Sequence, residues 1–263
     1  MMTTLFVTGY KNINREQWVA YNRKQSVYVH DFCRMALAFA SAGHRLLVYV
    51  DQDVRKECEE TFQGIGASQP DLVEFVDLST VSTFLDKYLP VEQAIIDSAE
   101  YKATIPPSRK TNPEHVYAAY NLINHSKINM VADAAKANPS YDYYMWTDFG
   151  CKDYPSATLA LNRCPPSKVV YALYTQLPFQ RPDATQMLSS DTIYFMGSQF
   201  VVHKDAVEAY EALYEAMLLE LHQRNISDDD QNVVLQLYYQ DTSLFAPVYL
   251  GQWFSLLSRF LNT

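Results

Sequence analysis

The chain has 263 residues, of which 48% are hydrophobic and 19% are charged, a composition that excludes a disordered or collagen-like protein. Asp and Glu outnumber Lys and Arg by 30 to 21, which gives a formal net charge of −9. Because proteins that bind nucleic acid neutralise its phosphates with an excess of cations, we expect no nucleic-acid partner.

The first half of the chain alternates short apolar runs with longer helical patterns. This alternation predicts an α/β domain with a largely parallel sheet flanked by helices. Asn14 is expected to cap the first helix, which runs to about Ala42 and ends at Gly43. In chain order we expect strands at Thr4–Thr8, Arg45–Asp51 and Leu72–Asp77, a helix at Ser79–Leu89, and an irregular proline-rich segment at Ile105–Pro113.

The second half continues in the same way, and no repeat or flexible linker divides it from the first. We therefore expect a single domain over residues 1–263. The expected elements are a long helix at Glu114–Ala137, strands at Tyr141–Trp146 and Lys168–Tyr174, an irregular stretch to Ser190, a strand at Thr192–Val202, and helices at Asp205–Arg224, Asp228–Tyr239 and Gly251–Leu261.

The cysteines and the hydropathy pattern indicate a cytoplasmic protein. The four cysteines form no Cys-x-x-Cys pair, so neither a zinc site nor a disulfide framework is expected. The start of the chain has no basic stretch followed by a long apolar run, as a signal peptide would. The longest uncharged span, 242–258, contains Pro247 and Gly251, so we expect no transmembrane segment.

Polar residues follow several predicted strands, and the carboxyl ends of parallel strands are where ligands bind in α/β sheets. The first strand ends in Thr8–Lys11, the second in Asp51–Asp53, and a later one in Thr147–Gly150. Asp148 directly follows an aromatic-rich strand. A hard divalent cation prefers one or two carboxylates plus phosphate oxygens. Asp148 is therefore either a metal ligand or a carboxylate that caps the following turn.

The long predicted helix places Tyr120, Asn124, Lys127 and Val131 on one face. Apolar positions bracket Asn124 and Lys127, so both should be at least half buried. Two readings of Lys127 are open: it contacts an anionic group such as a diphosphate, or its stem covers the core while its ammonium reaches solvent.

Three consecutive aspartates, Asp228 to Asp230, precede a predicted apolar helix. Acidic residues there can simply complement the helix dipole, for which one or two would suffice. A catalytic carboxylate that takes a proton from an attacking hydroxyl is the alternative. Other catalytic signatures are incomplete: Asp148–Gly150 spells the kinase magnesium triplet without its upstream catalytic loop, and neither a glycine-rich phosphate loop nor a G-x-S-x-G elbow is present.

Five segments of the chain together resemble the HtrL/YibB family of glycosyltransferase-like proteins. They are FVTGYKNINRE, SKINMVADAAKANPSYDYYMWTDFG, IYFMGSQF, SDDDQNVVL and GQW, in matching order over nearly the whole chain. The family is similar to the GT-A class, with a single Rossmann-like α/β domain, a nucleotide-diphosphate sugar as donor and usually Mn²⁺ or Mg²⁺. The resemblance makes residues 1–150 the nucleotide-binding half and 151–263 the acceptor-side half.

The resemblance also implies roles for individual residues. Thr8 and Tyr10 would cradle the nucleoside, Arg15 and Lys127 would meet the donor's negative charge, and Asp148 would hold the metal. Asp230, or else Asp229, would be the catalytic base. Asn124, Thr147, Gly197 and Trp253 complete the expected nucleotide-sugar site. Gly150 occupies the second acidic place of the Asp-x-Asp metal motif of GT-A enzymes, and Gly197-Ser198 stands where two glycines are expected.

The expected reaction is transfer of a sugar, with a UDP-sugar as the first candidate donor, to a hydroxyl of a glycan, glycolipid or glycoprotein. A base acting in line would invert the anomeric configuration. Two alternatives stay open. One is a nucleotidyltransferase, which normally has a glycine-rich, Arg-containing loop after the first strand. The other is a non-catalytic relative that binds a nucleotide or carbohydrate, which the missing second aspartate allows.

Overall fold

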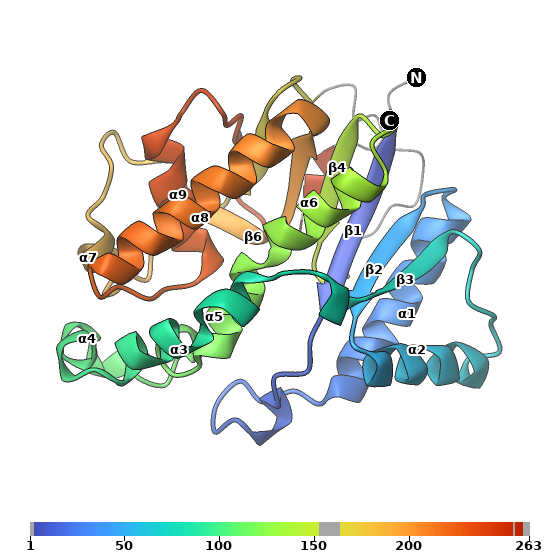
Figure 1. Cartoon of the computed structure of the whole chain (residues 1–263), viewed down its shortest axis with the longest axis horizontal. Helices are drawn as coiled ribbons and strands as arrows, with labels where there is room; N and C mark the ends of the chain where they lie inside the picture. The colour runs from blue at the N-terminus through green and yellow to red at the C-terminus, as the bar shows by residue number, and fades with distance from the viewer. Residues whose placement is uncertain (1–2, 153–163, 255, 260–263) are drawn as a thin grey trace.

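A computed structural model describes residues 3–152, 164–254 and 256–259 of the chain (Figure 1). Within these residues seven strands form one sheet in the order β3-β2-β1-β4-β6-β5-β7. The strands are β1 (Thr4–Tyr10), β2 (Leu46–Val50), β3 (Val73–Asp77), β4 (Tyr143–Thr147), β5 (Val169–Leu173), β6 (Phe195–His203) and β7 (Val248–Tyr249).

The predicted fold class is confirmed, because the sheet is mixed and mostly parallel. β1 runs parallel to both β2 and β4, and β2 runs parallel to β3. β6 is antiparallel to β4 and β5, whereas β7 is parallel to β5. Val7 pairs with Trp146, and Thr147 pairs with Gln199. The end of β4 therefore lies beside the middle of β6.

Helices cover both faces of this sheet (Figure 1). They are α1 (Gln25–Ser41), α2 (Gln52–Gly64), α3 (Phe84–Asp97), α4 (Ala99–Thr104), α5 (Ala118–His125), α6 (Lys127–Ala137), α7 (Ala184–Met187), α8 (Val207–Gln223), α9 (Asp230–Gln240) and α10 (Leu256–Arg259). Helices α1, α2 and α10 bury one face of the sheet, and α3, α5, α6, α8 and α9 contribute to the core on the other. Successive side chains of a strand point to opposite faces of the sheet, so strands β1 to β6 each contribute to both cores.

The first helix begins later than the sequence predicts. Asn14 adopts a left-handed backbone with φ of 55°, and its side chain makes no capping hydrogen bond. Tyr21 is also left-handed, with φ of 57°. Two left-handed residues cannot belong to a right-handed helix. The segment before Gln25 is therefore a loop with a single short 3-10 turn at Arg15–Gln17.

The long helix expected at Glu114–Ala137 is divided into α5 and α6. At Ser126 the backbone ψ is −3°, and the hydroxyl donates a hydrogen bond to the carbonyl of Leu122 at 2.6 Å. The same hydroxyl accepts the N–H of Leu85 at 3.2 Å. Hydroxyl bonds of this kind to the preceding turn bend helices. Because of this break, Lys127 is the first residue of α6.

Several boundaries also differ from expectation. Helices α2 and α4 were not expected, and α3 begins five residues after Ser79 because Thr83 and Asp86 form a capping box there. The segment expected to be irregular contains a 3-10 turn at Pro107–Arg109. Of the helix predicted at Gly251–Leu261, Leu256–Arg259 is helical, and residues 255 and 260–261 lie outside the described residues. No helix in the described part of the chain is both long and apolar enough to cross a membrane.

Candidate functional site

A cleft of about 630 Å³ opens at the carboxyl ends of β1 and β4. The end of β1 forms one wall, the residues after β4 form another, and the junction of α5 and α6 closes the third. The described residues that line it are Gly9, Tyr10, Lys11, Ile13, Arg15, Tyr28, Tyr120, Ile123, Asn124, Lys127, Met130, Trp146, Asp148 and Phe149. Of the residues predicted for the site, the structure thus brings Tyr10, Arg15, Asn124, Lys127 and Asp148 together around one space.

The ammonium of Lys127 joins two carboxylates from distant parts of the chain. Its Nζ lies 3.1 Å from Asp148 Oδ1 and 2.8 Å from Asp230 Oδ2. It also donates to the carbonyl of Gly197 at 2.9 Å. The Lys127 and Asp230 side chains are each 8% exposed, whereas that of Asp148 is 37% exposed and reaches the cleft. The lysine therefore contacts an anionic partner within the protein, not solvent.

These neighbours fix the charge of the lysine. Burial alone would lower the pKa of Lys127, but the carboxylates of Asp148 and Asp230 outweigh burial and hold it above its ordinary value. Burial raises the pKa of Asp148, while Lys127 and the indole N–H of Trp146, which donates to Asp148 Oδ1 at 2.9 Å, oppose that shift. Lys127 is therefore a permanent cation at neutral pH.

Gly197 leaves room for the carboxylate of Asp230. A Cβ at position 197 would lie 2.4 Å from Asp230 Oδ2 and 2.6 Å from Oδ1, closer than real Cβ contacts. Gly197 is thus part of the site through its missing side chain and through its carbonyl, which accepts from Lys127. The predicted proximity of Gly197 to the site agrees with this arrangement.

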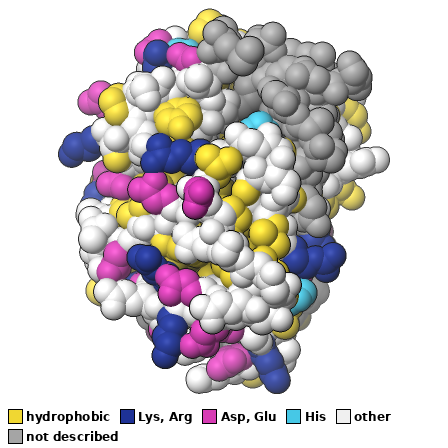
Figure 2. Space-filling model, turned by 90° about the vertical axis from the view of Figure 1, so that its right-hand side faces the viewer, with side chains coloured by type: hydrophobic (Ala, Val, Ile, Leu, Met, Phe, Trp, Pro, Cys, Tyr) yellow, Lys and Arg dark blue, Asp and Glu magenta, His cyan; other side chains and the backbone are white. Residues whose placement is uncertain are grey.

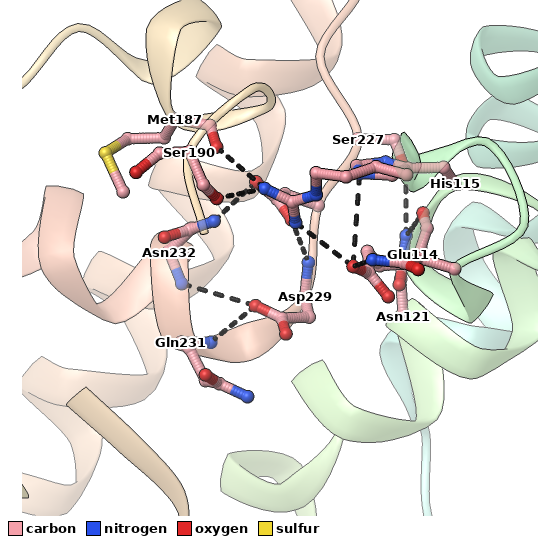
Figure 3. Close-up of polar contacts among 12 residues, drawn as sticks. Glu114, His115, Asn121, Met187, Ser190, Ser227, Asp229, Gln231 and Asn232 are labelled. Atoms are coloured by element: carbon pink, nitrogen blue, oxygen red, sulfur yellow. Dashed lines mark hydrogen bonds and ion pairs between the residues drawn. The ribbon is translucent and has the colours of Figure 1, made fainter. Parts of the chain in front are cut away.

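The other candidate base, Asp229, is occupied as the N-cap of α9. Its Oδ1 accepts from the backbone N–H groups of Gln231 at 3.1 Å and Asn232 at 3.4 Å (Figure 3). Burial, with the charges of Asp228 and Asp230, raises the pKa of Asp229 well above its ordinary range. Burial also raises the pKa of Asp228 to about 6. Asp229 and Asp230 therefore have different partners although they are adjacent.

The segment that leads into α9 is held by a buried polar cluster (Figure 3). Asn121 donates to the Ser227 hydroxyl at 2.9 Å, and His125 Nε2 lies 3.0 Å from the carbonyl of Asp228. The side chain of Asn232 donates to Asp228 Oδ2 at 2.7 Å. The N-terminus of α9, and with it Asp230, is thereby anchored to the rest of the molecule.

Arg15 is held at the mouth of the cleft by aromatic groups. Its guanidinium donates to the Tyr28 hydroxyl and to the Tyr21 carbonyl. Its Cζ lies 5.2 Å from the ring centroid of Trp18 and 5.6 Å from that of Tyr120, within the range of cation–π contacts. No described carboxylate forms an ion pair with Arg15, so its charge is available to a ligand.

Tyr10 belongs to an aromatic wall of the cleft. Its ring stacks on that of Phe149 with centroids 5.1 Å apart, and Phe149 in turn stacks on Phe32 at 4.3 Å. Burial raises the pKa of Tyr10 to about 12, so its hydroxyl stays protonated. Sequence reasoning missed Tyr28 and Phe149 as lining residues. The misplaced start of the first helix hid Tyr28, and Phe149 carries only a generic apolar signal.

Six predicted residues are not among those that line the cleft: Asp229, Asp230 and Gly197, whose contacts are described above, and Thr8, Thr147 and Trp253. Thr8 and Thr147 are fully buried at the ends of β1 and β4, and neither hydroxyl has a hydrogen-bond partner among the described residues. Trp253 is 37% exposed, and its ring lies 6.0 Å from that of Tyr174, next to β7. The structure thus places the two threonines behind the cleft and the tryptophan apart from it.

The Mn²⁺ or Mg²⁺ that the resemblance implies stays a prediction, and the donors around Asp148 do not fit it. In the described ranges no three His, Cys, Asp or Glu side chains gather into a possible metal site. The two nearby carboxylates, Asp148 and Asp230, already share the ammonium of Lys127. A divalent cation between them would meet that positive charge at close range.

The cleft lies where β1 and β4 end, as expected for α/β proteins. A family described as "Bacterial protein of unknown function (HtrL_YibB)" matches residues 2–262. Protein HtrL of Escherichia coli (strain K12) is 24% identical over 276 residues, which cover 98% of this chain and 92% of that protein.

Two solved structures show more distant similarity. One is galactosyltransferase LgtC with donor and acceptor sugar analogues, at 12% identity, a TM-score of 0.47, and coverage of 92% of this chain and 72% of that chain. The other is 4-diphosphocytidyl-2C-methyl-D-erythritol synthase from Anaerococcus prevotii, at 9% identity, a TM-score of 0.46, and coverage of 97% and 92%. Similarity this low says nothing about the site. Since the family match spans nearly every residue, this chain belongs to the HtrL/YibB family.

Proposed function

We propose that this protein is a glycosyltransferase that binds a nucleotide-diphosphate sugar, a UDP-sugar first of all, in the cleft between β1 and β4. The observation that carries the proposal is the contact of Lys127 with both Asp148 and Asp230 at the base of an aromatic-walled cleft. Residues from three distant segments converge there. The acceptor in this proposal is a hydroxyl of a glycan, glycolipid or glycoprotein.

The charge of the cleft suits an anionic donor. The protein as a whole has a net charge of −9. The described charged residues that line the cleft are nevertheless Lys11, Arg15 and Lys127 against Asp148 alone. Lys127 is shared by Asp148 and Asp230, and Lys11 lies 3.4 Å from Asp51. Arg15, which has no ion-pair partner among the described residues, is therefore the cation left to attract a diphosphate to this place. Arg15 can form two parallel hydrogen bonds to phosphate, which a lysine cannot.

The aromatic wall suits the nucleoside and the sugar. Tyr10 lines the cleft and is backed by Phe149, so its position is fixed by packing. A flat ring that is fixed in this way offers a stacking surface for a base. In this proposal Asp148, the more exposed carboxylate, accepts hydrogen bonds from hydroxyl groups of the donor. Asn124 adds an amide from α5, on another wall of the cleft.

In the transfer step the acceptor oxygen attacks the anomeric carbon, the bond from that carbon to the diphosphate breaks, and the hydroxyl proton moves to a base. We assign the base to Asp230 and not to Asp229, because the Asp229 carboxylate caps α9. The Asp230 carboxylate is held in place by the Lys127 ammonium, 2.8 Å from its Oδ2. Direct attack of this kind gives an inverted product.

The proposal is tested by incubating the purified chain with a panel of nucleotide sugars and measuring release of the nucleoside diphosphate. Slow hydrolysis of one donor is expected, and Asp148→Asn and Asp230→Asn should each reduce it by about 100-fold or more. Asp229→Asn, which retains the cap, should leave it nearly unchanged. Pyrophosphate release from a nucleoside triphosphate and a sugar phosphate would instead identify a nucleotidyltransferase. Binding without turnover would identify a non-catalytic relative.

A further inference from the structure

The position after Phe149 is closed to a second acidic side chain. Gly150 has φ of +76°, a backbone conformation that disfavours any residue with a Cβ. A Cβ there would also lie 3.1 Å from both Asp31 Cβ and the Tyr28 carbonyl. The second carboxylate of an Asp-x-Asp motif is therefore disfavoured at this place. Both the backbone conformation of Gly150 and the packing of α1 against this loop oppose a side chain there.

The inner oxygen of Asp148 is already satisfied by two donors. Lys127 Nζ lies 3.1 Å from Oδ1, and the Trp146 indole donates to the same atom at 2.9 Å. Lys127 is in turn held by Asp230 and by the Gly197 carbonyl. Three acceptors thus take the three N–H groups of the ammonium beside Asp148, the carboxylate that reaches the cleft among the described residues. The Lys127 ammonium thus lies beside Asp148, the residue that the resemblance assigns to the metal ion.

A second fixed cation faces the same space. Arg15 lines the cleft, is held by Tyr28 and Tyr21, and has no carboxylate partner among the described residues. Building on the proposed function, we propose that the cleft binds a nucleoside diphosphate without a divalent cation, because Arg15 supplies positive charge to the ligand while the Lys127 ammonium neutralises the carboxylates beside it. Charge-assisted hydrogen bonds from fixed cations are about twice as strong as neutral ones.

The test is calorimetric titration of UDP into the full chain after removal of metal with EDTA, repeated with excess Mn²⁺. We expect UDP to bind in EDTA, with a dissociation constant that changes by less than about 3-fold on adding Mn²⁺. Arg15→Met should weaken binding in EDTA by about 10- to 100-fold, the loss of a hydrogen bond to a charged group. Lys127→Met should weaken it as well, because Asp148 and Asp230 would then lack the ammonium that neutralises them and would repel the diphosphate. Lys56→Met, which removes a fully exposed lysine on α2, is the matched control and should bind as the wild type does.

The outcomes separate the two proposals. Binding that requires Mn²⁺ would overturn the cation-free site and leave the glycosyltransferase proposal intact. Absence of UDP binding in both buffers would remove the support for a UDP-sugar donor as well. If Lys127→Met fails to fold, Arg15→Met decides the question, because Arg15 is half-buried at the cleft mouth and outside the core. Unchanged binding by a folded Arg15→Met would contradict the inference.

Discussion

Gly197 shows how strongly the site depends on one absent side chain. In Gly197→Ala the new methyl group would overlap the Asp230 carboxylate, so Asp230 must move and Lys127 loses a partner. We expect a cost of about 1–3 kcal/mol in stability. We also expect at least tenfold weaker UDP binding. Thermal unfolding and calorimetric titration measure the two effects.

Gly64→Ala is the control for that substitution. Gly64 ends α2, its φ is not left-handed, and nothing lies within 4 Å of a Cβ built there. Alanine is favoured over glycine in helices, so stability should be unchanged or slightly higher. If both alanine variants bind UDP equally well, Gly197 does not support the site.

His115 makes the stability of the protein depend on pH. Its side chain is 1% exposed, and burial lowers its pKa to about 4 from an unfolded value near 6.5. Between these values the unfolded chain binds a proton that the folded chain does not. The contribution of His115 to stability is therefore complete above pH 6.5 and is lost as the pH falls toward 4.

The raised pKa of Asp228 acts in the opposite sense, so a difference measurement is needed. Its stability contribution falls as pH rises from about 4 to about 6. In His115→Asn the loss of stability on acidification should be smaller than in the wild type by about 1–3 kcal/mol. Urea denaturation at pH 4.5 and pH 7 measures this difference. His30→Asn, at an exposed position on α1, should behave as the wild type.

At the scale of the element, the N-terminus of α9 combines capping with mutual repulsion of aspartates. Asp229 caps the helix while its pKa is raised by burial and by Asp228 and Asp230. An asparagine caps equally well and carries no charge. We expect Asp229→Asn to be at least as stable as the wild type at pH 7. Asp229→Ala should be less stable than Asp229→Asn by about 1 kcal/mol. Equal stability of the two variants in urea denaturation would contradict the capping role.

Strands β1 to β6 were predictable because each is a short apolar run between turn signals, whereas the two-residue strand β7 was not expected. β1, β2, β4 and β6 all coincide with expected strands to within a few residues. Helix ends were less predictable where tertiary contacts decide them. Ser126 ends α5 through bonds to Leu122 and to the distant Leu85, and no local pattern reveals the second of these.

The candidate site was predictable where residues follow strands or lie on a helix stripe. Asp148 and Lys127 were singled out in this way, and they lie 3.1 Å apart. The contact of Lys127 with Asp230 depends on how α9 packs on β6, because Asp230 lies 103 residues from Lys127 along the chain. The sequence alone could not distinguish a diphosphate-binding lysine from one whose charge is shared with two carboxylates.

At the scale of the whole molecule, the two predicted halves share one sheet and two cores. β4, in the first half, pairs along its length with β6, in the second. Leu5 and Leu244 belong to one hydrophobic cluster, and Phe6 and Leu257 belong to the other. We therefore expect one cooperative unfolding transition, with coincident curves from far-UV circular dichroism and tryptophan fluorescence. Two separated transitions would show that the halves fold independently.

On one face of the molecule the charged side chains are dispersed. Figure 2 shows acidic and basic side chains interspersed over the face that it presents, with hydrophobic side chains scattered between them. On helix α2 two pairs of opposite charge, Arg55 with Glu59 and Lys56 with Glu60, lie four residues apart. Exposed pairs of this kind contribute little to stability but keep a surface soluble.

The stacking of Trp18 on Tyr117, at 4.1 Å and 10° between ring planes, has a practical consequence. Trp18 is 6% exposed and contacts both Arg15 and Tyr120, two residues of the cleft wall. A ligand that moves the Arg15 guanidinium away from the Trp18 indole changes the electrostatic environment of that chromophore. A shift of tryptophan emission on titration, smaller in Trp18→Phe because Trp146 also lines the cleft, would therefore reveal occupancy without an added label.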